Sequence, residues 1–478
     1  MTVSLEQRVF RVKKDGAFVR PPSPAPGAFD ICIAFRETWL TKLFARGPVM
    51  KHTIEEVVGC YSSDKKRLYM KAAETLKWKP ICRRDSHIRA FIKVEKLESD
   101  VKDPVPRTIQ PRSKRYNLVL GQYLRLNEKR FTRTIDSVFG ETTVLSGYDN
   151  VVQASILRSK WAHYSDPVAI GLDASRFDQH CSSEALKFEH SFYTRVFKGD
   201  QELVKLLEWQ RSNKGTAIVD TGECLKYEVE GCRMSGDINT SLGNKIIMCA
   251  MVYSYLRYYD IDAKLANNGD DCVLFCSKQS TEKIMGTLPG FFLNLGYTME
   301  VESPVDIFER TVFCRSQPVC VNGKWAMVRQ LGSLSRDCFS THDWTNETTF
   351  KDNMNAIGQC NGIINDGVPV HMEQARTMWR AGGARRFDIE ALRTQIEYSW
   401  RDRLGSRDRL LWSPVQDSTR LSYFLAFGIE PQVQRAVESY LSRVSLTAGG
   451  QTLPSLPKHY SRLHKDLLKC RIANCFAS

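Results

Sequence analysis

Three short polar segments stand in a fixed order near the middle of the 478-residue chain. The first, residues 171–180, is Gly-Leu-Asp-Ala-Ser-Arg-Phe-Asp-Gln-His and follows an apolar run. The second, residues 235–244, has the pattern Ser-Gly-x3-Thr-x3-Asn, and the third, residues 269–271, is Gly-Asp-Asp in an Asn-rich turn. Their order is more informative than any one of them. The residues concerned are Asp173 and Asp178, then Ser235, Gly236, Thr240 and Asn244, then Asp270 and Asp271.

Chance explains some of these segments better than others. A chain of this length is expected to hold on the order of one accidental Asp-x4-Asp pair, so that pair has no weight alone. A random Gly-Asp-Asp is expected about once in ten such chains, and the second pattern in well under roughly one in a hundred. Taken singly, the first pair suits a solvated strand-to-helix loop and the last pair an ordinary hairpin turn. The joint occurrence makes these ordinary explanations improbable.

Composition narrows the class of protein. Apolar residues make up 42% and charged residues 26% of the chain, which is typical of a globular protein with several lobes rather than a disordered one. Lys and Arg number 68 against 54 for Asp and Glu, which gives a formal charge of +14. This excess favours a polyanionic partner, nucleic acid first and an anionic membrane surface second. Charge alone does not decide function.

Cysteine usage and hydropathy give two further expectations. The 15 cysteines include no Cys-x2-Cys pair, so neither a zinc site nor a secreted disulfide scaffold is predicted, and reduced thiols in a cytosolic setting are expected. The first residues lack the apolar core of a signal peptide. No apolar run reaches about 18 residues, so no intrinsic transmembrane segment is predicted, while peripheral attachment stays open.

The N-terminal third divides into segments of different character. Residues 21–27 (Pro-Pro-Ser-Pro-Ala-Pro-Gly) predict an extended linker between a basic arm and the body. Apolar spacing predicts mostly helix over 30–79. Residues 88–94 alternate as a strand does, and three prolines force extended geometry near Arg107 and Arg112.

The rest of the chain shows alternating strand and helix signals. We expect strands at 168–172 and 297–301, two strands joined by the Gly-Asp-Asp turn, and a hairpin over 312–325. Residues 446–457 are rich in Gly and Pro and predict a linker to a basic end. Helices are expected over 183–197, 241–258, 281–295, 373–380, 389–400 and 432–443.

These segments resemble motifs A, B and C in the palm of viral RNA-dependent RNA polymerases. The resemblance covers about residues 88–318 and is closest to small positive-strand plant viruses of the tombusvirus–carmovirus–dianthovirus group. It is carried by Asp-Ala-Ser-Arg-Phe-Asp-Gln-His at 173–180, by Val-Pro-Arg-Thr-Ile-Gln-Pro-Arg-Ser-x-Arg-Tyr-Asn at 105–117, and by Phe-Cys-Arg-Ser-Gln-Pro-Val at 313–319.

The resemblance implies a right-hand α+β fold with an antiparallel palm sheet flanked by helices. It also implies synthesis that starts without a protein primer. The expected parts are an N-terminal arm and linker (1–29), fingers (30–165), palm with motif A (166–200), a fingers insertion (201–230), palm with motifs B to E (231–330), thumb (331–445) and a basic tail (446–478).

The acidic residues suit metal-dependent nucleotidyl transfer. In this reaction a 3′-hydroxyl attacks an α-phosphate in line, and two Mg²⁺ ions roughly 3.5–4 Å apart activate the hydroxyl and steady the leaving pyrophosphate. Mg²⁺ prefers carboxylate and phosphate oxygens, so convergent aspartates are its natural ligands. We expect Asp173 and Asp270 as ligands, with Asp271 secondary and Mn²⁺ as a substitute ion.

The resemblance assigns the remaining site residues. Asp178 and Asn244 would bracket the ribose 2′-hydroxyl, with Ser235 and Thr240 nearby, and Gly236 would let the backbone approach template or nucleotide closely. A helix-surface or capping amide remains the alternative for Asn244. Four basic residues resemble motif F and would bind the triphosphate, although a charge run is more often a solvated face. They are Lys93, Lys96, Arg107 and Arg112, and Arg315 of motif E would contact the nascent strand.

One departure from the family pattern concerns motif D. Many relatives carry a lysine there that would protonate pyrophosphate, but residues 295–302 contain none, and Glu300 stands where a base is expected. The general acid is therefore unassigned, with Lys283 a weakly supported alternative.

The resemblance also suggests partners. Single-stranded RNA template, nascent RNA and NTPs are expected ligands. Such replicases often extend a shorter membrane-bound protein by readthrough or frameshift. A membrane-anchored viral co-protein and host factors are therefore expected at replication complexes on membranes in the host cytoplasm.

Two other functions stay open at this stage. A reverse transcriptase or DNA polymerase would commonly carry an aromatic or alanine near the motif C aspartates and a bulky residue where a 2′-hydroxyl would clash. Asn268-Gly269 and Asn244 argue against it. A non-catalytic basic RNA-binding or virion protein would suit the charge but would leave the ordered Asp/Asn set to coincidence.

Overall fold

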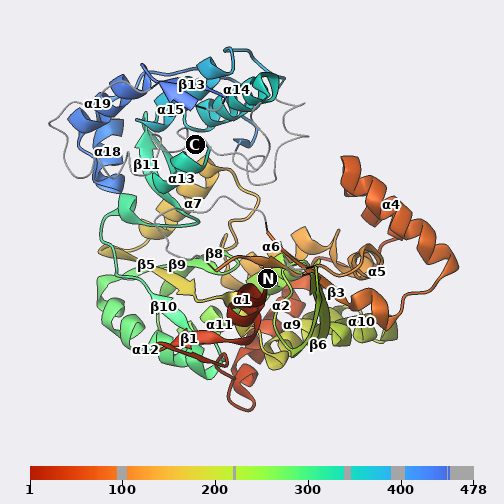
Figure 1. The fold of residues 1–478 in the computed structure, drawn as a ribbon. Coiled ribbons are helices and arrows are strands. Elements are labelled where there is room, and N and C mark those ends of the chain that lie inside the picture. Colours follow the sequence, from red (N-terminus) through yellow and green to blue (C-terminus); the bar gives the residue numbers. More distant parts are fainter. Residues whose placement is uncertain (94–104, 219–221, 338–345, 389–403, 449, 453–478) are drawn as a thin grey trace. The chain divides into compact units, whose positions relative to one another are not determined.

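The computed structural model describes residues 1–93, 105–218, 222–337, 346–388, 404–448 and 450–452 (Figure 1). By internal contacts the chain divides into two compact units. Unit 1 comprises Met1–Val144 and Leu172–Ser303, and unit 2 comprises Leu145–Gly171 and Pro304–Ser478. Helices and strands mix in both units, which agrees with the expected α+β class.

A four-stranded sheet formed mainly by residues of unit 1 carries the acidic segments, and residues 167–171 at the start of one of its strands belong to unit 2. Its strand order is β10-β5-β9-β8, and the pairs β10–β5 and β8–β9 are antiparallel. Helix α11 packs against β8 and helix α12 against β10. The sheet and its helices are β5 (Pro167–Ala174), β8 (Ala263–Asn268), β9 (Asp271–Ser277), β10 (Met299–Val301), α11 (Thr240–Tyr258) and α12 (Thr281–Asn294).

Strand β9 and helix α11 form the centre of this core. Residues 272–276 of β9 are buried without alternation, as expected of a strand covered on both faces. Helix α11 is apolar around most of its circumference, and such helices lie inside a protein. Ile246, Ile247, Met251 and Tyr255 of this helix, which was predicted over 241–258, are fully buried.

A second four-stranded sheet lies in the same unit, in the order β4-β3-β6-β7. Strand β3 pairs antiparallel with β4 and parallel with β6, and β6 pairs antiparallel with β7. A Cβ on Gly215 of β6 would stand 2.1 Å from the Tyr227 ring, so this ring lies directly over the strand. The strands are β3 (Ile88–Ile92), β4 (Thr108–Ile109), β6 (Ser212–Ile218) and β7 (Cys224–Glu230).

The remaining elements of unit 1 confirm the helical prediction for residues 30–79 and the helix over 183–197. They are the short helical turns η2 (Ala28–Cys32), η3 (Arg83–Ser86) and η4 (Lys278–Ser280), and the helices α2 (Ile33–Phe44), α3 (Ile54–Gly59), α4 (Ser63–Trp78), α5 (Lys114–Leu124), α6 (Glu128–Phe139), α8 (Phe177–His180), α9 (Ser183–Val196) and α10 (Gln201–Arg211).

The N-terminal residues differ from the predicted arm. They form α1 (Thr2–Leu5), the π-helical turn η1 (Glu6–Phe10) and the hairpin β1 (Val12–Lys14)–β2 (Ala17–Val19). Leu5 and Val9 are each only 3% exposed within a cluster on the second sheet, so this segment is not separated from the body. The prediction was wrong because two apolar residues among charged ones give too weak a periodicity to indicate burial.

Unit 2 joins helices to a hairpin. Strands β11 (Ser316–Val321) and β12 (Lys324–Arg329) pair antiparallel, four residues later than the hairpin predicted over 312–325. Helix α7 packs on β12, and α18 packs on β11. The other elements are α7 (Asn150–Trp161), η5 (Phe308–Arg310), α13 (Gly332–Asp337), α14 (Glu347–Ile364), α15 (His371–Ala381), α18 (Asp417–Phe427) and α19 (Pro431–Leu441).

The end of the described chain corrects another expectation. Residues 445–447 (β13, Ser445–Thr447) and 450–452 (β14, Gly450–Thr452) pair antiparallel, where the sequence predicted a linker. Glycine is common in turns as well as in linkers, so the glycine at position 450 did not distinguish a hairpin from a linker. Two further predictions, the helix over 389–400 and the basic tail from 453, lie outside the described residues.

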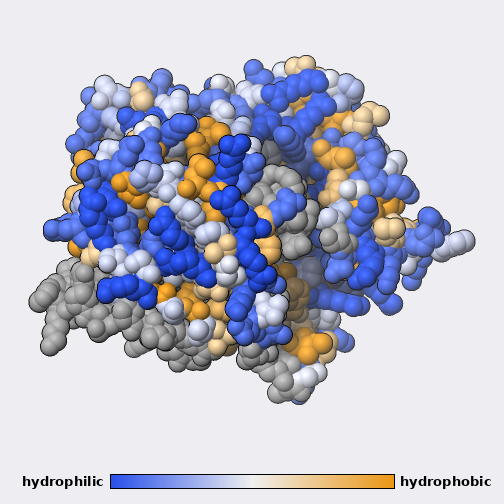
Figure 2. Space-filling model, turned by 90° about the horizontal axis from the view of Figure 1, so that it is seen from above, coloured by the Kyte–Doolittle hydropathy of each residue, from blue (hydrophilic) through white to orange (hydrophobic). Residues whose placement is uncertain are grey.

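Figure 2 shows a face on which hydrophilic residues prevail and hydrophobic residues form small separated patches. No helix in the described part of the chain is both long and apolar enough to cross a membrane.

A buried ion pair ties helix α9 to the segment before α11. Arg233 and Glu189 have side chains that are 1% and 0% exposed, and Nη2 of Arg233 donates to Oε2 of Glu189. Tyr193 Oη (2.7 Å) and Asn239 Nδ2 (2.8 Å) donate to the other carboxylate oxygen. Gly243 makes room for the pair, because a Cβ there would stand 2.4 Å from Glu189 Oε1 and 2.5 Å from Arg233 Nη2.

This crowding predicts opposite effects of the same substitution at two helical glycines. Gly243→Ala should lower the free energy of unfolding by about 2–4 kcal/mol, because the new methyl displaces a buried ion pair. Gly286→Ala in α12, where a Cβ would meet nothing within 4 Å, should raise it by about 0.5–1 kcal/mol. Urea unfolding followed by circular dichroism measures both. Equal effects would contradict the packing described.

Candidate active site

The turn between β8 and β9 is fixed by one buried asparagine. Asn267 is fully buried, and its Nδ2 donates to the Gly269 carbonyl (2.7 Å) while its Oδ1 accepts from the Gly269 amide (3.0 Å). Gly269 has φ 85°, a backbone conformation that favours glycine. The turn therefore presents Asp270 at its tip, with Asp271 exposed at the start of β9 in register with Asn268.

Asp173 lies near the end of β5, in the same sheet. It is exposed and pairs in register with Glu300 of β10. Partial burial raises the pKa of Asp270, the charge of Asp173 raises it further, and Arg107 opposes the rise. Burial and the same Asp173 charge raise the pKa of Glu302. Asp173 thus repels two neighbouring carboxylates, and a cation would relieve this repulsion.

Asp178 and Asn244 meet although 66 residues separate them in the sequence. Asn244 Nδ2 donates to Asp178 Oδ1 at 2.9 Å, and Asn244 Oδ1 accepts from Arg233 Nε at 3.1 Å. Arginine has no acceptor atom, so the amide oxygen must face Arg233 and the NH₂ group must face Asp178. The structure therefore brings together the two residues that the resemblance assigned to one task.

Contacts within the protein hold the loop of residues 235–240 in place. Ser235 Oγ accepts from the Gln110 amide (3.2 Å) and donates to the Thr108 carbonyl (3.4 Å). A Cβ on Gly236 would stand 2.5 Å from Pro111 Cα, so its backbone closely approaches the 108–111 segment. The approach of Gly236 to template or nucleotide stays a prediction. Thr240 Oγ1 bonds the Met234 (2.8 Å) and Asp237 (2.9 Å) carbonyls and stabilises the loop.

The four basic residues predicted to bind triphosphate do not all lie in the same environment. Lys93 and Arg107 line a pocket with the acidic residues. Arg112 does not line this pocket. Its side chain is 0% exposed, and its guanidinium pairs at 2.5 Å with Oδ1 of Asp237, whose side chain is 2% exposed. We therefore correct the prediction for Arg112, which stabilises the loop that carries Ser235. Lys96 lies outside the described residues.

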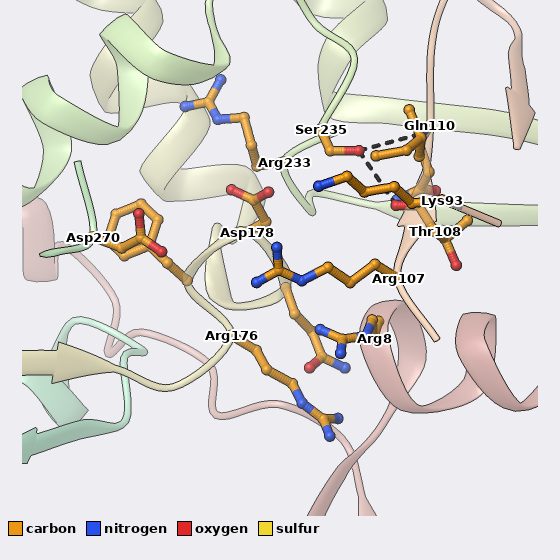
Figure 3. Close-up of a pocket in the computed structure, with 13 residues that line it drawn as sticks. Arg8, Lys93, Arg107, Thr108, Gln110, Arg176, Asp178, Arg233, Ser235 and Asp270 are labelled. Atoms are coloured by element: carbon orange, nitrogen blue, oxygen red, sulfur yellow. Dashed lines mark hydrogen bonds between the residues drawn. The ribbon is translucent and has the colours of Figure 1, made fainter. Parts of the chain in front are cut away.

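Two neighbouring pockets in unit 1 share Asp178, Ser235 and Asp270. The first, of about 280 Å³, is shown in Figure 3, where Lys93 and Arg107 reach in from one side toward Asp178 and Asp270. The second, of about 480 Å³, also includes Asn244 and Thr240. Cationic side chains outnumber the carboxylates in the first pocket. They are Arg8, Lys93, Arg107, Arg176 and Arg233, of which Arg233 is buried and paired with Glu189.

The acidic residues fit a metal that arrives with its substrate. Within the described ranges, no three His, Cys, Asp or Glu side chains form a ready metal cage. Mg²⁺ is usually held by one or two carboxylates together with substrate phosphates and water, so a complete protein cage is not required. Asp173 and Asp270 are exposed and repel each other, and Asp270 lines the pocket that also holds the cationic side chains, which suits that donor set.

Two residues from the sequence analysis lie elsewhere. Arg315 is exposed before β11 in unit 2, has φ 55°, and accepts a bond from the Gln330 amide through its carbonyl (2.9 Å). Lys283 in α12 donates to the Tyr259 carbonyl at the end of α11, which gives it a structural partner and does not support a proton-donating role.

Sequence reasoning missed three cations of the first pocket. Arg176 and Arg233 stand inside or beside recognised segments, but nothing in their spacing indicates which charge faces a ligand. Arg8 is remote in sequence and gave no signal. Charge pattern alone could not have found it, because the N-terminal segment was predicted to be a separate arm.

The environment of Asp178 predicts a pH-dependent stability effect. Burial raises the pKa of its carboxyl to about 6, although the Asn244 bond and the Arg233 charge oppose the rise. In the unfolded chain this proton leaves near about pH 4, so the folded state binds more protons between about pH 4 and 6, and stability falls as pH rises through that window.

Asp178→Asn removes this ionisation. The variant should be more stable than the wild type at about pH 8, by on the order of 2 kcal/mol, and equally stable near about pH 4. Urea unfolding at the two pH values measures the difference. A difference in the free energy of unfolding between variant and wild type that is equal at both pH values, or larger at the acidic pH, would contradict the environment described for Asp178.

The chain is similar in sequence to known proteins. The chain is 62% identical over 472 residues to the RNA-directed RNA polymerase of red clover necrotic mosaic virus, which covers 98% of the chain and 62% of that relative. It is 63% identical over 475 residues (99% and 62%) to the RNA-directed RNA polymerase of carnation ringspot virus (isolate Lommel). Identity to the corresponding protein of cymbidium ringspot virus is 41% over 454 residues (94% and 54%).

The chain thus spans less than two thirds of the length of these relatives. The family model described as viral RNA dependent RNA polymerase matches residues 1–449, which is most of the chain. The chain therefore belongs to the viral RNA-dependent RNA polymerase family.

Proposed function

We propose that this chain catalyses RNA-templated RNA synthesis for a positive-strand plant virus. The observation that carries the proposal is the convergence of three segments, distant in sequence, on neighbouring pockets. Asp178, Asn244 and Asp270 come from those segments, and Asp178 and Asn244 are joined by a hydrogen bond. Cations beside them suit a nucleoside triphosphate.

The sugar of the incoming nucleotide would be selected at Asp178 and Asn244. An ionised carboxylate can accept from a 2′-hydroxyl while the amide NH₂ donates to it, so the pair recognises a group that both donates and accepts. Arg233 fixes which end of the Asn244 amide faces Asp178. A deoxyribose offers no such hydroxyl and would leave these polar groups unpaired.

The triphosphate would lie along the cationic side of the first pocket. Arg107 offers a bidentate contact and Lys93 a point charge, both opposite the acidic residues. Asp173 and Asp270, with Asp271 as a secondary ligand, would hold two Mg²⁺ ions, or Mn²⁺ in their place. Bound ions would neutralise the phosphates and lower the pKa of the attacking 3′-hydroxyl.

The family supports a right-hand arrangement. In this proposal the sheet β10-β5-β9-β8 is the palm and the sheet β4-β3-β6-β7 belongs to the fingers. The thumb is then sought in residues 331–445, with Arg315 as a contact of the nascent strand. Primer-independent initiation, a membrane-anchored viral co-protein, host factors and a location at membrane replication complexes also stay predictions.

Removing either primary acid should abolish synthesis. Asp173→Ala and Asp270→Ala should each lower primer-independent incorporation of labelled NTPs on single-stranded RNA with Mg²⁺ by at least about a thousandfold, because the metal ions lose a protein ligand. Asp306→Ala, which removes an exposed acid in unit 2, is the matched control. Full activity of both acid variants would refute the proposed metal ligands.

Sugar selection should depend on the amide of Asn244. Asn244→Ala should reduce the preference for rNTP over dNTP, measured as the ratio of kcat/KM values, by about tenfold or more. Gln201→Ala, an exposed amide on α10, serves as the control. A wild type that incorporates dNTPs as well as rNTPs would instead favour a DNA-synthesising enzyme.

A further inference from the structure

The N-terminal strap, defined as residues 4–11, contacts the loop that carries Arg107. Arg8 Nε donates to the carbonyls of Val105 (3.2 Å) and Pro106 (3.0 Å), and its Nη2 donates to Val105 (2.7 Å). Ser4, which is fully buried, donates from Oγ to the Pro106 carbonyl at 2.6 Å and also bonds the Thr108 hydroxyl. The strap thus holds the backbone before Arg107 and the side chain of Thr108 after it.

The same strap contacts the turn that carries Asp178. Arg176 Nη1 donates to the Gln7 carbonyl, and Gln179 Nε2 donates to the Arg11 carbonyl at 2.9 Å. Arg176 has φ 46°, a left-handed conformation that a non-glycine residue keeps only with support from its surroundings. The strap supplies bonds on both sides of Asp178.

Apolar burial anchors the strap itself. Leu5 and Val9 are each 3% exposed and belong to one cluster with Ile88, Ala90 and Ala217 of the second sheet. Leu5 and Val9 lie four residues apart, so they share one helical face. The strap is therefore fixed to the sheet and bonded to both pocket loops, and Figure 3 shows Arg8 and Arg176 beside that pocket.

We propose that the N-terminal strap is a positioning element of the active site, which holds the Arg107 loop and the Asp178 turn so that both face one nucleotide. This inference rests on the proposed polymerase function. It deepens that function by assigning a role to Ser4 and Arg8, which lie far from every recognised motif. Ser4 is the more telling residue, because it does not line the pocket and can act only through the 105–108 segment.

Steady-state kinetics on the full chain test the proposal. Ser4→Ala removes two buried bonds, and Arg8→Lys keeps the charge but loses the forked contact with two carbonyls. Each should raise KM for the NTP about fivefold while kcat changes by less than about twofold, because the phosphate contact is misplaced and the chemistry is intact. Lys13→Ala, an exposed cation just beyond the strap, should match the wild type.

A merely structural role gives a different result. Loss of folded enzyme would lower kcat and leave KM unchanged, and that outcome in both variants would overturn the proposal. Amide hydrogen exchange of residues 105–112 and 174–180 is the second readout. Faster exchange in Ser4→Ala than in Lys13→Ala supports the proposal that the strap holds these two segments, and equal exchange overturns it.

The two readouts separate the strap from the function on which it rests. If neither wild type nor Lys13→Ala makes template-dependent RNA, the proposed function fails. Hydrogen exchange still decides whether the strap holds the two loops. If both make RNA and the strap variants show wild-type KM, the strap proposal alone is overturned.

Discussion

The buried contact between Arg233 and Glu189 is the interaction on which the site depends. Both side chains are almost completely excluded from water, so each would be unstable without the other. The carboxylate is satisfied by Tyr193 and Asn239, and the guanidinium extends to Asn244. One buried pair thereby orients the amide that meets Asp178. Removal of either charge would leave the other buried and unpaired, at a cost of about 3–5 kcal/mol.

A second buried pair, Arg112 with Asp237, supports the segment that carries Arg107, which we propose to bind phosphate. Arg112 bonds Asp237, the Ser86 carbonyl (2.7 Å) and Asn213 Oδ1 (2.6 Å). It fixes the segment after Arg107 to the loop before α11. Burial raises the pKa of Asp237, which Arg112 counteracts most strongly. A backbone that is already held lowers the entropic cost of binding a ligand through exposed cations, and here a buried cation holds it.

Much of the fold follows from local patterns in the sequence. Strand β5, helices α9 and α11 and the two strands around Gly269 lie where apolar periodicity and turn residues predict them, because each signal is contained within one element. The pairing of Asp178 with Asn244 was also foreseen, through resemblance to a family rather than through spacing.

Polar contacts between distant segments could not be predicted in this way. Arg107 and Arg112 occupy similar positions in a basic stretch. Only Arg107 lines the pocket, because Arg112 is buried in an ion pair with Asp237. Nothing in a short segment tells a buried cation from an exposed one. The strap was missed for the same reason: the partners of Ser4 are about a hundred residues away.

A structure of the chain with template RNA, a non-hydrolysable NTP and Mn²⁺ tests the central claim most directly. Anomalous scattering would locate the metal independently of the protein density. The account predicts Mn²⁺ bound by Asp173 and Asp270, phosphates beside Arg107, and the ribose at Asp178 and Asn244. Metal bound at other residues, or a nucleotide outside this pocket, would contradict it.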